Sequence, residues 1–351
     1  MKNFNEKHRS TLETYYTKII AQTITKDGKF LLAICKRTKI IAFCLEQHLK
    51  EICHEFQLND GLQSILLNQK RYPIAQINVI DCLSLCLIDS IPSKYHFAVG
   101  GKGYIKGFEL NAETINEFNE KWNITFSENI SVDCLTIHEH SNQLIVGCSD
   151  TNIRLFDLKT NLNLSKLSSH YDYIHDLKAS KSIEPIFYSG SEDGTVRCWD
   201  ARIGSKPFNV LIPSENKAIE RPEFGEWIGT IDVNDDQWLV CGGGPSLSVW
   251  HLKINDCAHI IKTPGVIYCS KFVSEDLDII AAGDQNTIVY WERNHPFMSE
   301  SIHVKSSIDT IYSMSHHNYK NFNYNLFSFC GDNHQIEICK NATHIDWKLS
   351  V

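Results

Sequence analysis

Hydrophobic and polar positions recur along this chain in one repeated phrase. A short apolar strand leads into small residues and a polar turn, and a second alternating strand ends in a large apolar residue. The seven copies lie at 30–43, 97–108, 144–156, 187–199, 239–250, 279–291 and 326–339. Because side chains alternate between two faces with a period of two residues, each copy predicts a β-hairpin rather than a helix.

The residue that closes each copy is in most cases aromatic. The closing residues are Phe43, Phe108, Phe156, Trp199, Trp250, Trp291 and Cys339. Most of them lie 41 to 51 residues apart, close to the ~40–45 residues of one blade in a WD-type propeller. A ring that large fills the space between stacked sheets. The pattern therefore predicts an all-β, seven-bladed WD40-type β-propeller that spans 1–351 as one domain.

Further strands complete the predicted blades. Inner strands are expected before the phrases, at 19–24, 132–137, 174–178, 228–233, 266–272 and 308–314. Outer strands are expected at 206–212 and 343–351. These elements place the blades at about 15–49, 78–112, 131–165, 170–213, 226–256, 265–305 and 307–351. The strand at 344–350 is expected to complete the last sheet, but the pattern leaves open whether the N-terminal segment also joins it.

One connection is much longer than the others. Phe43 and Phe108 are 65 residues apart, and the extra length falls at 49–77. This stretch contains Pro73 and the apolar run 65–67. Long connections often carry function, so both an interaction role and a passive insertion remain open.

The blade at 170–202 carries a complete set of polar residues. We expect His170 to join the turn residue Asp193 to the hydroxyl of Ser189, and that hydroxyl to meet the indole N–H of Trp199. A histidine, an aspartate and a serine can also form a hydrolytic triad. The spacing follows the repeat itself, which favours a structural tetrad. Blades that close on phenylalanine lack the indole donor and are expected to rely on apolar packing.

Composition changes the functional picture more than the fold. Apolar residues make up 42% of the chain and charged residues 22%, and 34 lysines and arginines against 42 acidic residues give a formal charge of −8. Proteins that bind nucleic acid on their own usually present a basic face. The basic stretch at 26–39 is interpreted as a solvated edge of the first blade. The charge therefore favours protein partners over direct contact with RNA.

No catalytic, cofactor or metal site is predicted. The glycine runs at 100–103 and 242–244 do not open a helix, as a phosphate-binding loop requires. His138 and His140 alternate along a strand and His316 and His317 are adjacent, but no third ligand lies near either pair. We expect a protein that is not an enzyme, with no cofactor, no metal and no small-molecule substrate.

The thirteen cysteines contain no Cys-x-x-Cys arrangement. Cys44, Cys148, Cys198 and Cys241 lie beside strand residues and are expected to be buried thiols in a reducing compartment. The first ten residues are polar, and no segment has the roughly 18 apolar residues of a membrane helix. These observations predict a cytosolic or nuclear protein.

Two stretches go beyond a generic repeat. Residues 226–253 read EWIGTIDVNDDQWLVCGGGPSLSVWHLK, and 170–202 include the run Asp-Tyr-Ile-His at 172–175. Over about 165–255 the chain resembles the THO complex subunit 6 family. The resemblance implies a nuclear scaffold that contacts other THO subunits within the transcription–export assembly, coupling messenger RNA processing to export, with RNA reached only through the complex. The N-terminal third matches the family weakly.

A second reading is a substrate receptor of a cullin-4 ubiquitin ligase. The string at 199–202, Trp-Asp-Ala-Arg, matches the ending of many propellers that dock on the adaptor of that ligase, with Arg202 as the contact. The structural interpretation is an exposed turn after the third strand. A propeller enzyme is a third class, and no catalytic constellation indicates it.

Candidate contact residues follow from the loops before the inner strands. Aromatic and arginine side chains carry much of the energy of protein interfaces. Tyr171, Tyr173, Arg221 and Trp227 lie on or beside such loops. Tyr173 and Trp227 are equally compatible with a core position.

Overall fold

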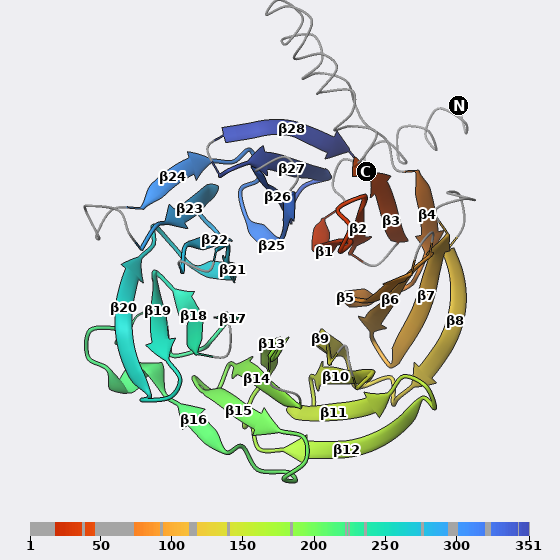
Figure 1. Ribbon diagram of the computed structural model, residues 1–351, viewed down its shortest axis with the longest axis horizontal. Helices are drawn as coiled ribbons and strands as arrows, with labels where there is room; N and C mark the ends of the chain where they lie inside the picture. Colours follow the sequence, from red (N-terminus) through yellow and green to blue (C-terminus); the bar gives the residue numbers. More distant parts are fainter. Residues whose placement is uncertain are drawn as a thin grey trace, which may run out of the picture.

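A computed structural model describes the protein at residues 18–36, 39–45, 74–91, 94–111, 118–138, 141–182, 185–221, 223, 225–234, 237–274, 277–293, 301–319, 324–342 and 344–350. Its strands form seven four-stranded antiparallel sheets that stand around a central opening (Figure 1). The prediction of an all-β, seven-bladed propeller is confirmed.

The first four sheets follow one another in the chain. The first contains β1 (Ile19–Ile24), β2 (Phe30–Cys35), β3 (Lys39–Cys44) and β4 (Ala75–Asn78). The second contains β5 (Cys82–Ile91), β6 (Lys94–Gly101), β7 (Tyr104–Asn111) and β8 (Phe118–Thr125). The third contains β9 (Val132–His138), β10 (Gln143–Cys148), β11 (Asn152–Asp157) and β12 (Leu162–Ser168). The fourth contains β13 (Ile174–Ala179), β14 (Ile186–Ser191), β15 (Val196–Asp200) and β16 (Asn209–Leu211).

The last three sheets continue in the same order. The fifth contains β17 (Thr230–Asn234), β18 (Trp238–Gly244), β19 (Ser246–His251) and β20 (Asp256–Lys262), and the short 3₁₀ helix η1 (Pro213–Glu215) precedes it. The sixth contains β21 (Ile267–Phe272), β22 (Ile279–Gly283), β23 (Thr287–Trp291) and β24 (Ile302–Lys305). The seventh contains β25 (Ile311–Tyr319), β26 (Tyr324–Gly331), β27 (Gln335–Lys340) and β28 (His344–Ser350). In the ranges that the structure describes, no helix is long and apolar enough to cross a membrane.

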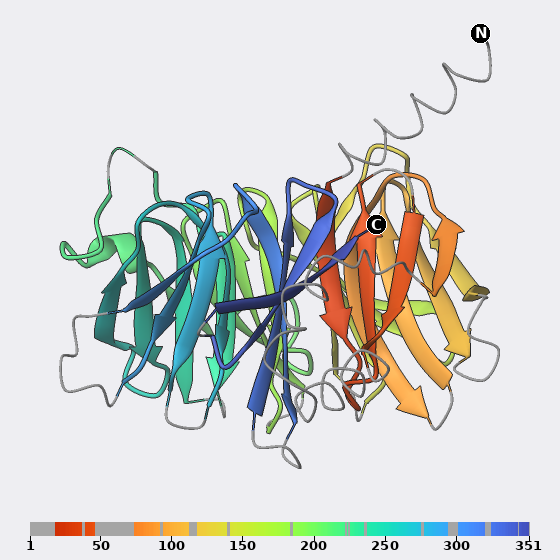
Figure 2. The same cartoon turned by 90° about the horizontal axis from the view of Figure 1, so that it is seen from above.

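The first strand of every sheet faces the central opening, and the molecule has two faces joined by the strands (Figures 1 and 2). We call the side where the inner strands begin the entry face. It also holds the connections between sheets and the turns between second and third strands. The opposite side is called the exit face.

The closing residues of the seven phrases form the packing between sheets. All seven are buried, and each pairs with an apolar residue of the second strand of its own sheet. Phe187 and Trp199 stack with ring centroids 5.9 Å apart, and Phe97 and Phe108 are 5.6 Å apart. Large flat side chains bury more apolar area than aliphatic ones, which explains why the repeat places aromatics here.

The closing residue also marks an irregularity of the sheet. The register between the third and fourth strands shifts at Phe108, Phe156, Trp250 and Cys339. A β-bulge increases the local twist of the strands. The fourth strand is thereby twisted relative to the third strand at the position where the side chain of the closing residue enters the space between sheets.

The ring closes without strand exchange among the described residues, because each sheet contains only consecutive strands. At the junction of the last and first sheets, Gln22 Nε2 donates hydrogen bonds to the backbone oxygens of Ser313 and Ser328, at 3.1 and 2.8 Å. Ile24 N donates to Ser315 Oγ at 2.9 Å. A hydrophobic cluster drawn from both sheets lies behind these bonds. Among the described residues, the two ends of the ring are thus joined by hydrogen bonds that each involve a side chain and by apolar packing.

Inner strands are linked in the same way elsewhere in the ring. Ser84 Oγ donates to Val132 O at 2.8 Å, between the second and third sheets. Asp176 Oδ2 accepts from Ile231 N at 3.0 Å, between the fourth and fifth. Short polar side chains of one inner strand thus satisfy backbone groups of the next, which fixes the relative height of neighbouring sheets.

The observed blade limits differ from the predicted ones at the outer strands. Three of the four residues of β4 lie inside the range 49–77 that we predicted as a connection, and 49–73 fall outside the described residues. β8 lies between two predicted blades, and β12 and β20 extend beyond the predicted ends at 165 and 256. Outer strands have few buried positions, so their hydrophobic pattern is weak and gives little indication of where they lie.

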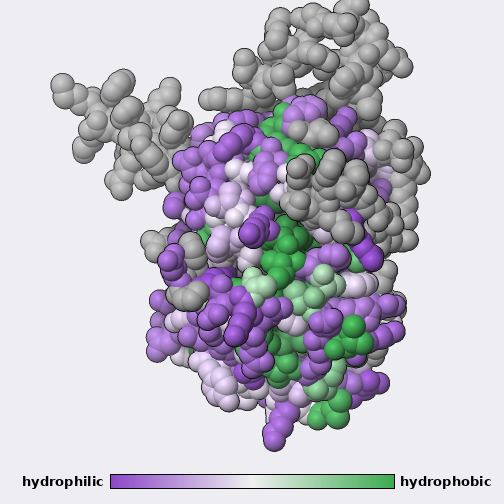
Figure 3. All heavy atoms as spheres, turned by 90° about the vertical axis from the view of Figure 1, so that its left-hand side faces the viewer, coloured by the Kyte–Doolittle hydropathy of each residue, from purple (hydrophilic) through white to green (hydrophobic). Residues whose placement is uncertain are grey.

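The outer strands also form the rim of the molecule. Figure 3, which shows the left-hand side of Figure 1, has hydrophobic residues set among hydrophilic ones. Val210 of β16, Ile260 of β20 and Ile302 of β24 are exposed on these outer strands. Lys262 and Lys305 end two of these edge strands and are exposed. Charges on an edge discourage pairing with another sheet.

Candidate functional site

The polar set of the fourth sheet forms a continuous chain of hydrogen bonds. His170 Nδ1 lies 2.8 Å from Asp193 Oδ2, and His170 Nε2 lies 2.7 Å from Ser189 Oγ. Trp199 Nε1 donates to the same Ser189 Oγ at 2.8 Å. Since Ser189 Oγ accepts from the indole, it donates its own proton to His170 Nε2, and His170 Nδ1–H donates to Asp193. The chain ties the entry-face turn to the interior of the sheet.

Burial and hydrogen bonding set the charge state of this tetrad. Burial lowers the pKa of His170, and the neighbouring Asp193 only partly offsets that effect. Burial also acts to raise the pKa of Asp193, but hydrogen bonds from His170 and Thr195 outweigh it and hold that pKa well below its usual range. A neutral histidine and an ionised aspartate result near pH 7. Ser189 is 0% exposed, so no substrate can reach its hydroxyl, which supports a structural role.

The fifth sheet satisfies its tryptophan differently. Trp250 Nε1 donates to Ser248 Oγ at 2.8 Å, and Ser248 in turn donates to Cys241 O at 3.3 Å. The serine here lies two residues before the indole on the same strand. Thus a buried indole N–H is paired in both sheets, but only the fourth uses a histidine.

A second set of residues lies where the inner strands begin on the entry face. In six sheets the register between the first and second strands skips one inner-strand residue at this point. The skipped residues are Ile20, Leu83, Asp133, His175, Tyr268 and Tyr312. A bulged residue is released from the ladder and its side chain is redirected.

The fifth sheet has no bulge at this point, and the ring of a residue outside the strand takes the place of the redirected side chain. Gly229 stands at the corresponding place, and a Cβ atom built on it would lie 2.3 Å from Cζ3 of Trp227. The indole of Trp227 therefore occupies the space that a side chain at 229 would fill. We call the six skipped residues together with Trp227 the entry ring.

Four members of the entry ring form a continuous aromatic arc. Ring centroids of His175 and Trp227 are 6.0 Å apart, those of Trp227 and Tyr268 6.3 Å, and those of Tyr268 and Tyr312 6.0 Å. These four side chains come from the fourth to seventh sheets. Tyr268 is 37% exposed, so part of this surface is open to solvent. We call His175, Trp227, Tyr268 and Tyr312 the aromatic arc.

The glycine run of β18 supports the arc. A Cβ atom on Gly243 would come within 2.7 Å of Trp227 Cε3, and one on Gly244 would lie 2.1 Å from Arg221 Nη1. Arg221 Nη2 donates to Trp227 O, and the guanidinium lies 5.6 Å from the centre of the indole ring. The run is thus explained by the close approach of two large side chains.

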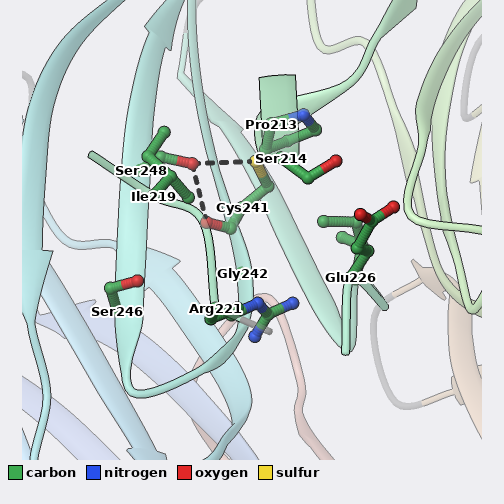
Figure 4. A pocket seen from close by; sticks show the side chains of 10 residues that line it. Pro213, Ser214, Ile219, Arg221, Glu226, Cys241, Gly242, Ser246 and Ser248 are labelled. Carbon is green, nitrogen blue, oxygen red and sulfur yellow. Dashed lines mark hydrogen bonds between the residues drawn. The ribbon is translucent and has the colours of Figure 1, made fainter. Parts of the chain in front are cut away.

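A small pocket lies beneath the loop that carries Arg221 (Figure 4). Its lining residues are Pro213, Ser214, Ile219, Arg221, Glu226, Ile228, Cys241, Gly242, Ser246 and Ser248. It has room for about one water molecule. Burial lowers the pKa of Arg221, and its Nη1 has no hydrogen-bond partner. The pocket is too small for a cofactor, so we interpret Arg221 as the residue that fastens this loop to β18.

The structure brings four of the predicted contact residues to one face. Tyr171 and Tyr173 are 86% and 52% exposed on the entry face, next to the tetrad. Trp227 and Arg221 lie beside them on the following connection. Arg202 lies apart, because it follows β15 on the exit face. Its guanidinium donates to Asp200 from Nε at 2.9 Å and from Nη2 at 2.6 Å.

Sequence reasoning missed His175, Tyr268 and Tyr312 as members of this surface. In the structure each is the second residue of its inner strand, whereas the strands predicted at 266–272 and 308–314 made Tyr268 the third residue and Tyr312 the fifth. The predicted inner strand boundaries gave no reason to expect a bulge there.

Cysteine and metal chemistry add nothing to the site in the described ranges. The twelve cysteines there are free, and Cys44, Cys148, Cys198 and Cys241 are buried as predicted. Burial raises the pKa of the Cys241 thiol to about 12, which removes its nucleophilic form at neutral pH. No group of three possible ligand side chains is found in that part of the chain.

Comparison with a family model supports the repeat. The model described as "WD domain, G-beta repeat" matches 122–157 and 162–200. Among solved structures, the WD40 β-propeller domain of Doa1 has a TM-score of 0.67 and covers 95% of this chain and 96% of its own. Its sequence is 14% identical, so this likeness concerns the fold alone.

Sequence relatives share much more of the chain. A protein of Danio rerio named THO complex subunit 6 homolog is 27% identical over 350 residues, covering 97% of this chain and 99% of its own length. The Homo sapiens THO complex subunit 6 is 28% identical over 291 residues, with 80% and 78% covered. The Arabidopsis thaliana THO complex subunit 6 is 25% identical over 186 residues, with 53% and 47% covered.

Proposed function

We propose that this chain, a WD-repeat propeller related along nearly its whole length to THO complex subunit 6 proteins, is a non-catalytic scaffold subunit of a THO complex. The observation that carries the proposal is the extent of the similarity to the Danio rerio relative, 97% of one chain and 99% of the other. In this role it supports assembly of the machinery that couples messenger RNA processing to nuclear export, and it acts in the nucleus.

The architecture suits a scaffold. A closed ring of seven sheets is a rigid body with two faces and a rim, and each can bind a different protein. The side chains of His170, Ser189 and Asp193 are nearly inaccessible to solvent and hydrogen-bonded within the fold. It stabilises the fourth sheet and leaves no activated nucleophile at the surface.

The charge of the chain supports protein partners over RNA. A formal charge of −8 opposes the approach of a phosphate backbone. We infer that other THO subunits bind this propeller directly and that messenger RNA is reached through them.

The cullin-4 receptor reading is not favoured. The named relatives that cover most of this chain are THO subunits. Arg202 already shares its guanidinium with Asp200, so a partner carboxylate at that turn would compete with an internal one.

Affinity purification of the tagged full-length protein tests the proposal. The extract is treated with nuclease, and the retained proteins are identified by mass spectrometry. Recovery of the other THO subunits after nuclease treatment is expected. Recovery of a cullin-4 ligase without THO subunits, or loss of the THO subunits on nuclease treatment, would contradict a protein-bound scaffold. Nuclear fluorescence of the tagged chain is expected in the same cells.

A further inference from the structure

We propose that the aromatic arc and the acidic loops around it bind a short segment of a partner protein that carries arginine or lysine side chains. The proposal rests on the scaffold function above and names the chemistry of one of its docking surfaces. Three observations carry it: the continuous aromatic surface, the unpaired carboxylates beside it, and the way this chain places its own arginines.

The arc offers several ring faces and edges in a row. His175, Trp227, Tyr268 and Tyr312 stand side by side from four consecutive sheets, with neighbouring centroids about 6 Å apart. Followed from ring to ring, the curved row is about 18 Å long, comparable to the contour length of about five residues of an extended chain. A peptide laid across the entry face can therefore place two or three side chains on the arc, because alternate residues of an extended segment point the same way.

The chain's own arginines already use aromatic rings on this face. The guanidinium of Arg221 lies 5.6 Å from the centre of the Trp227 ring, and that of Arg197 lies 5.4 Å from the centre of the Tyr171 ring. A guanidinium or ammonium is attracted to the negative face of such a ring. Tyr268 and Tyr312 have no such cation in the described part of the chain, so they remain open to one from a partner.

Carboxylates border the same four side chains. Glu226 precedes Trp227, and Asp284 is close enough to Tyr268 that its charge adds to burial in raising the pKa of that phenol. Asp309 and Asp332 belong to neighbouring entry-face loops, since Asn286 N donates to Asp309 O at 3.0 Å and Asp332 N donates to Thr310 O at 3.1 Å.

None of these four carboxylates is held in an ion pair in the described part of the chain, although Glu226 lies close enough to Arg221 for its charge to act on that guanidinium. Over the ranges that the structure covers, no lysine, arginine or histidine makes an ion pair with Glu226, Asp284, Asp309 or Asp332. Asp284 Oδ1 is buried and accepts no hydrogen bond. Other acidic residues of the ring, such as Asp150 with Arg154, are paired internally. A cation brought by a partner would gain charge-assisted contacts with these carboxylates.

Single-stranded RNA is the alternative occupant, because bases also stack on aromatic side chains. Its phosphates would have to approach Glu226, Asp284, Asp309 and Asp332, and like charges repel. The observations therefore favour a basic polypeptide, and RNA becomes an outcome of the test.

Fluorescence anisotropy with the full-length protein tests the proposal. The probes are a labelled twelve-residue peptide of six Ser-Arg repeats, which places all arginines on one side when extended, the same peptide with glutamine in place of arginine, and a labelled twelve-nucleotide oligo-uridine. Variants at the surface are Asp284→Asn and the pair Tyr268→Ala with Tyr312→Ala. Matched controls away from it are Asp256→Asn at the start of β20 on the exit face and Phe208→Ala before β16, both exposed.

The arginine peptide is expected to bind at least tenfold more tightly than the glutamine peptide, and more weakly as salt is added. Both surface variants should lose about five- to twentyfold in affinity for it, as expected when a cation–π or charge contact is removed, while both controls bind as the parent does. The proposal would be overturned if the two peptides bind equally or if the surface variants bind the arginine peptide as the parent does. It would also be overturned if the controls lose as much affinity as the surface variants, or if oligo-uridine binds more tightly than the arginine peptide. Melting temperatures within a few degrees of the parent show that the variants fold.

Affinity purification of the same variants separates this proposal from the scaffold function. If the THO subunits co-purify with the parent chain while the arginine peptide fails to bind, the scaffold function stands and the basic-segment proposal is wrong. If the peptide binds through the arc but no THO subunit co-purifies, the docking chemistry stands and its assignment to a THO complex is wrong.

Discussion

Gly243 lies directly against the indole of Trp227: a Cβ atom at 243 would come within 2.7 Å of both Cε3 and the backbone oxygen of Trp227. The glycine run of β18 and the tryptophan before β17 are thus two halves of one packing arrangement. The pair also determines where the centre of the aromatic arc lies.

We predict that Gly243→Ala displaces the Trp227 ring and destabilises the fold by about 1–3 kcal/mol, as overpacking usually does. The tryptophan emission should shift toward longer wavelength as the ring gains contact with water. Fluorescence spectra and urea unfolding measure the two effects. A variant with the parent's spectrum and stability would show that the loop before β17 yields easily, and that the glycine is not required for close approach.

Ser189 and Ser248 allow a matched comparison of two buried indoles. Ser189→Ala removes the partner of both Trp199 Nε1 and His170 Nε2, whereas Ser248→Ala removes that of Trp250 Nε1. Each buried polar group left unpaired costs about 1–3 kcal/mol. We therefore expect Ser189→Ala to lower the free energy of unfolding by about 2–4 kcal/mol and Ser248→Ala by about half as much, measured by urea unfolding. Equal losses would argue that His170 contributes nothing to the tetrad.

His316 should make the protein less stable in mild acid. Burial lowers its pKa from 6.5 to about 4, and a hydrogen bond with Asn325 Oδ1 only partly opposes this. Below pH 6.5 the histidine of the unfolded chain is protonated, whereas His316 of the folded chain stays neutral until about pH 4. The contribution of neutral His316 to the free energy of unfolding is therefore complete above about pH 6.5 and is lost as the pH falls toward 4. We expect a loss of about 2 kcal/mol between pH 7 and 4.5 from this residue.

Urea unfolding at several pH values checks that expectation. His316→Gln, which keeps a polar group near Asn325 but cannot titrate, should flatten the pH dependence. His303→Gln on an exposed part of β24 is the control and should leave the slope as in the parent. An unaltered slope in His316→Gln would assign the acid sensitivity to other groups.

Gln22→Ala should weaken the junction between the first and last sheets. It removes the donor to Ser313 O and Ser328 O, and we expect a loss of about 1–3 kcal/mol. Amide hydrogen exchange in β1 and β25 should accelerate more than exchange in β13 or β17. The exposed Gln237→Ala serves as the control. Uniform acceleration around the ring would mean that the junction has no stability of its own.

Arg202→Ala should leave both the stability of the protein and its binding to THO subunits nearly unchanged. The pair with Asp200 lies at the surface, with the arginine side chain 67% exposed, and solvent screening leaves such pairs little effect on stability. Recovery of THO subunits in affinity purification should be unchanged. Loss of a bound ligase adaptor in this variant alone would revive the receptor reading.

The sequence predicted the repeated strands of the sheets and the large apolar residues buried between them. The closing residues from Phe43 to Cys339 carry the packing between sheets, because large apolar side chains in a fixed register leave a clear pattern. The tetrad of the fourth sheet was equally accessible, because four residue types with defined hydrogen-bonding roles occur together in one repeat.

Features that depend on the backbone were not predictable in the same way. The bulges that turn out Tyr268 and Tyr312 depend on how each inner strand pairs, and the side-chain pattern continues through them. The outer strand β8 is mostly solvent-exposed, so its alternation carries little signal. Ring closure at Gln22 joins residues about 300 positions apart, and no local pattern indicates such a contact.

Closure of the described ring through side chains has a consequence during synthesis. Each sheet is finished before the next begins, but the apolar flank of the first sheet, including Leu31 and Phe43, is covered by residues from Leu326 to Leu349. At 5–20 residues per second, roughly 15–60 s separate the emergence of these two parts from the ribosome. During that interval the nascent chain carries an uncovered hydrophobic flank at its oldest end, and this is the surface that a ribosome-associated chaperone would have to shield.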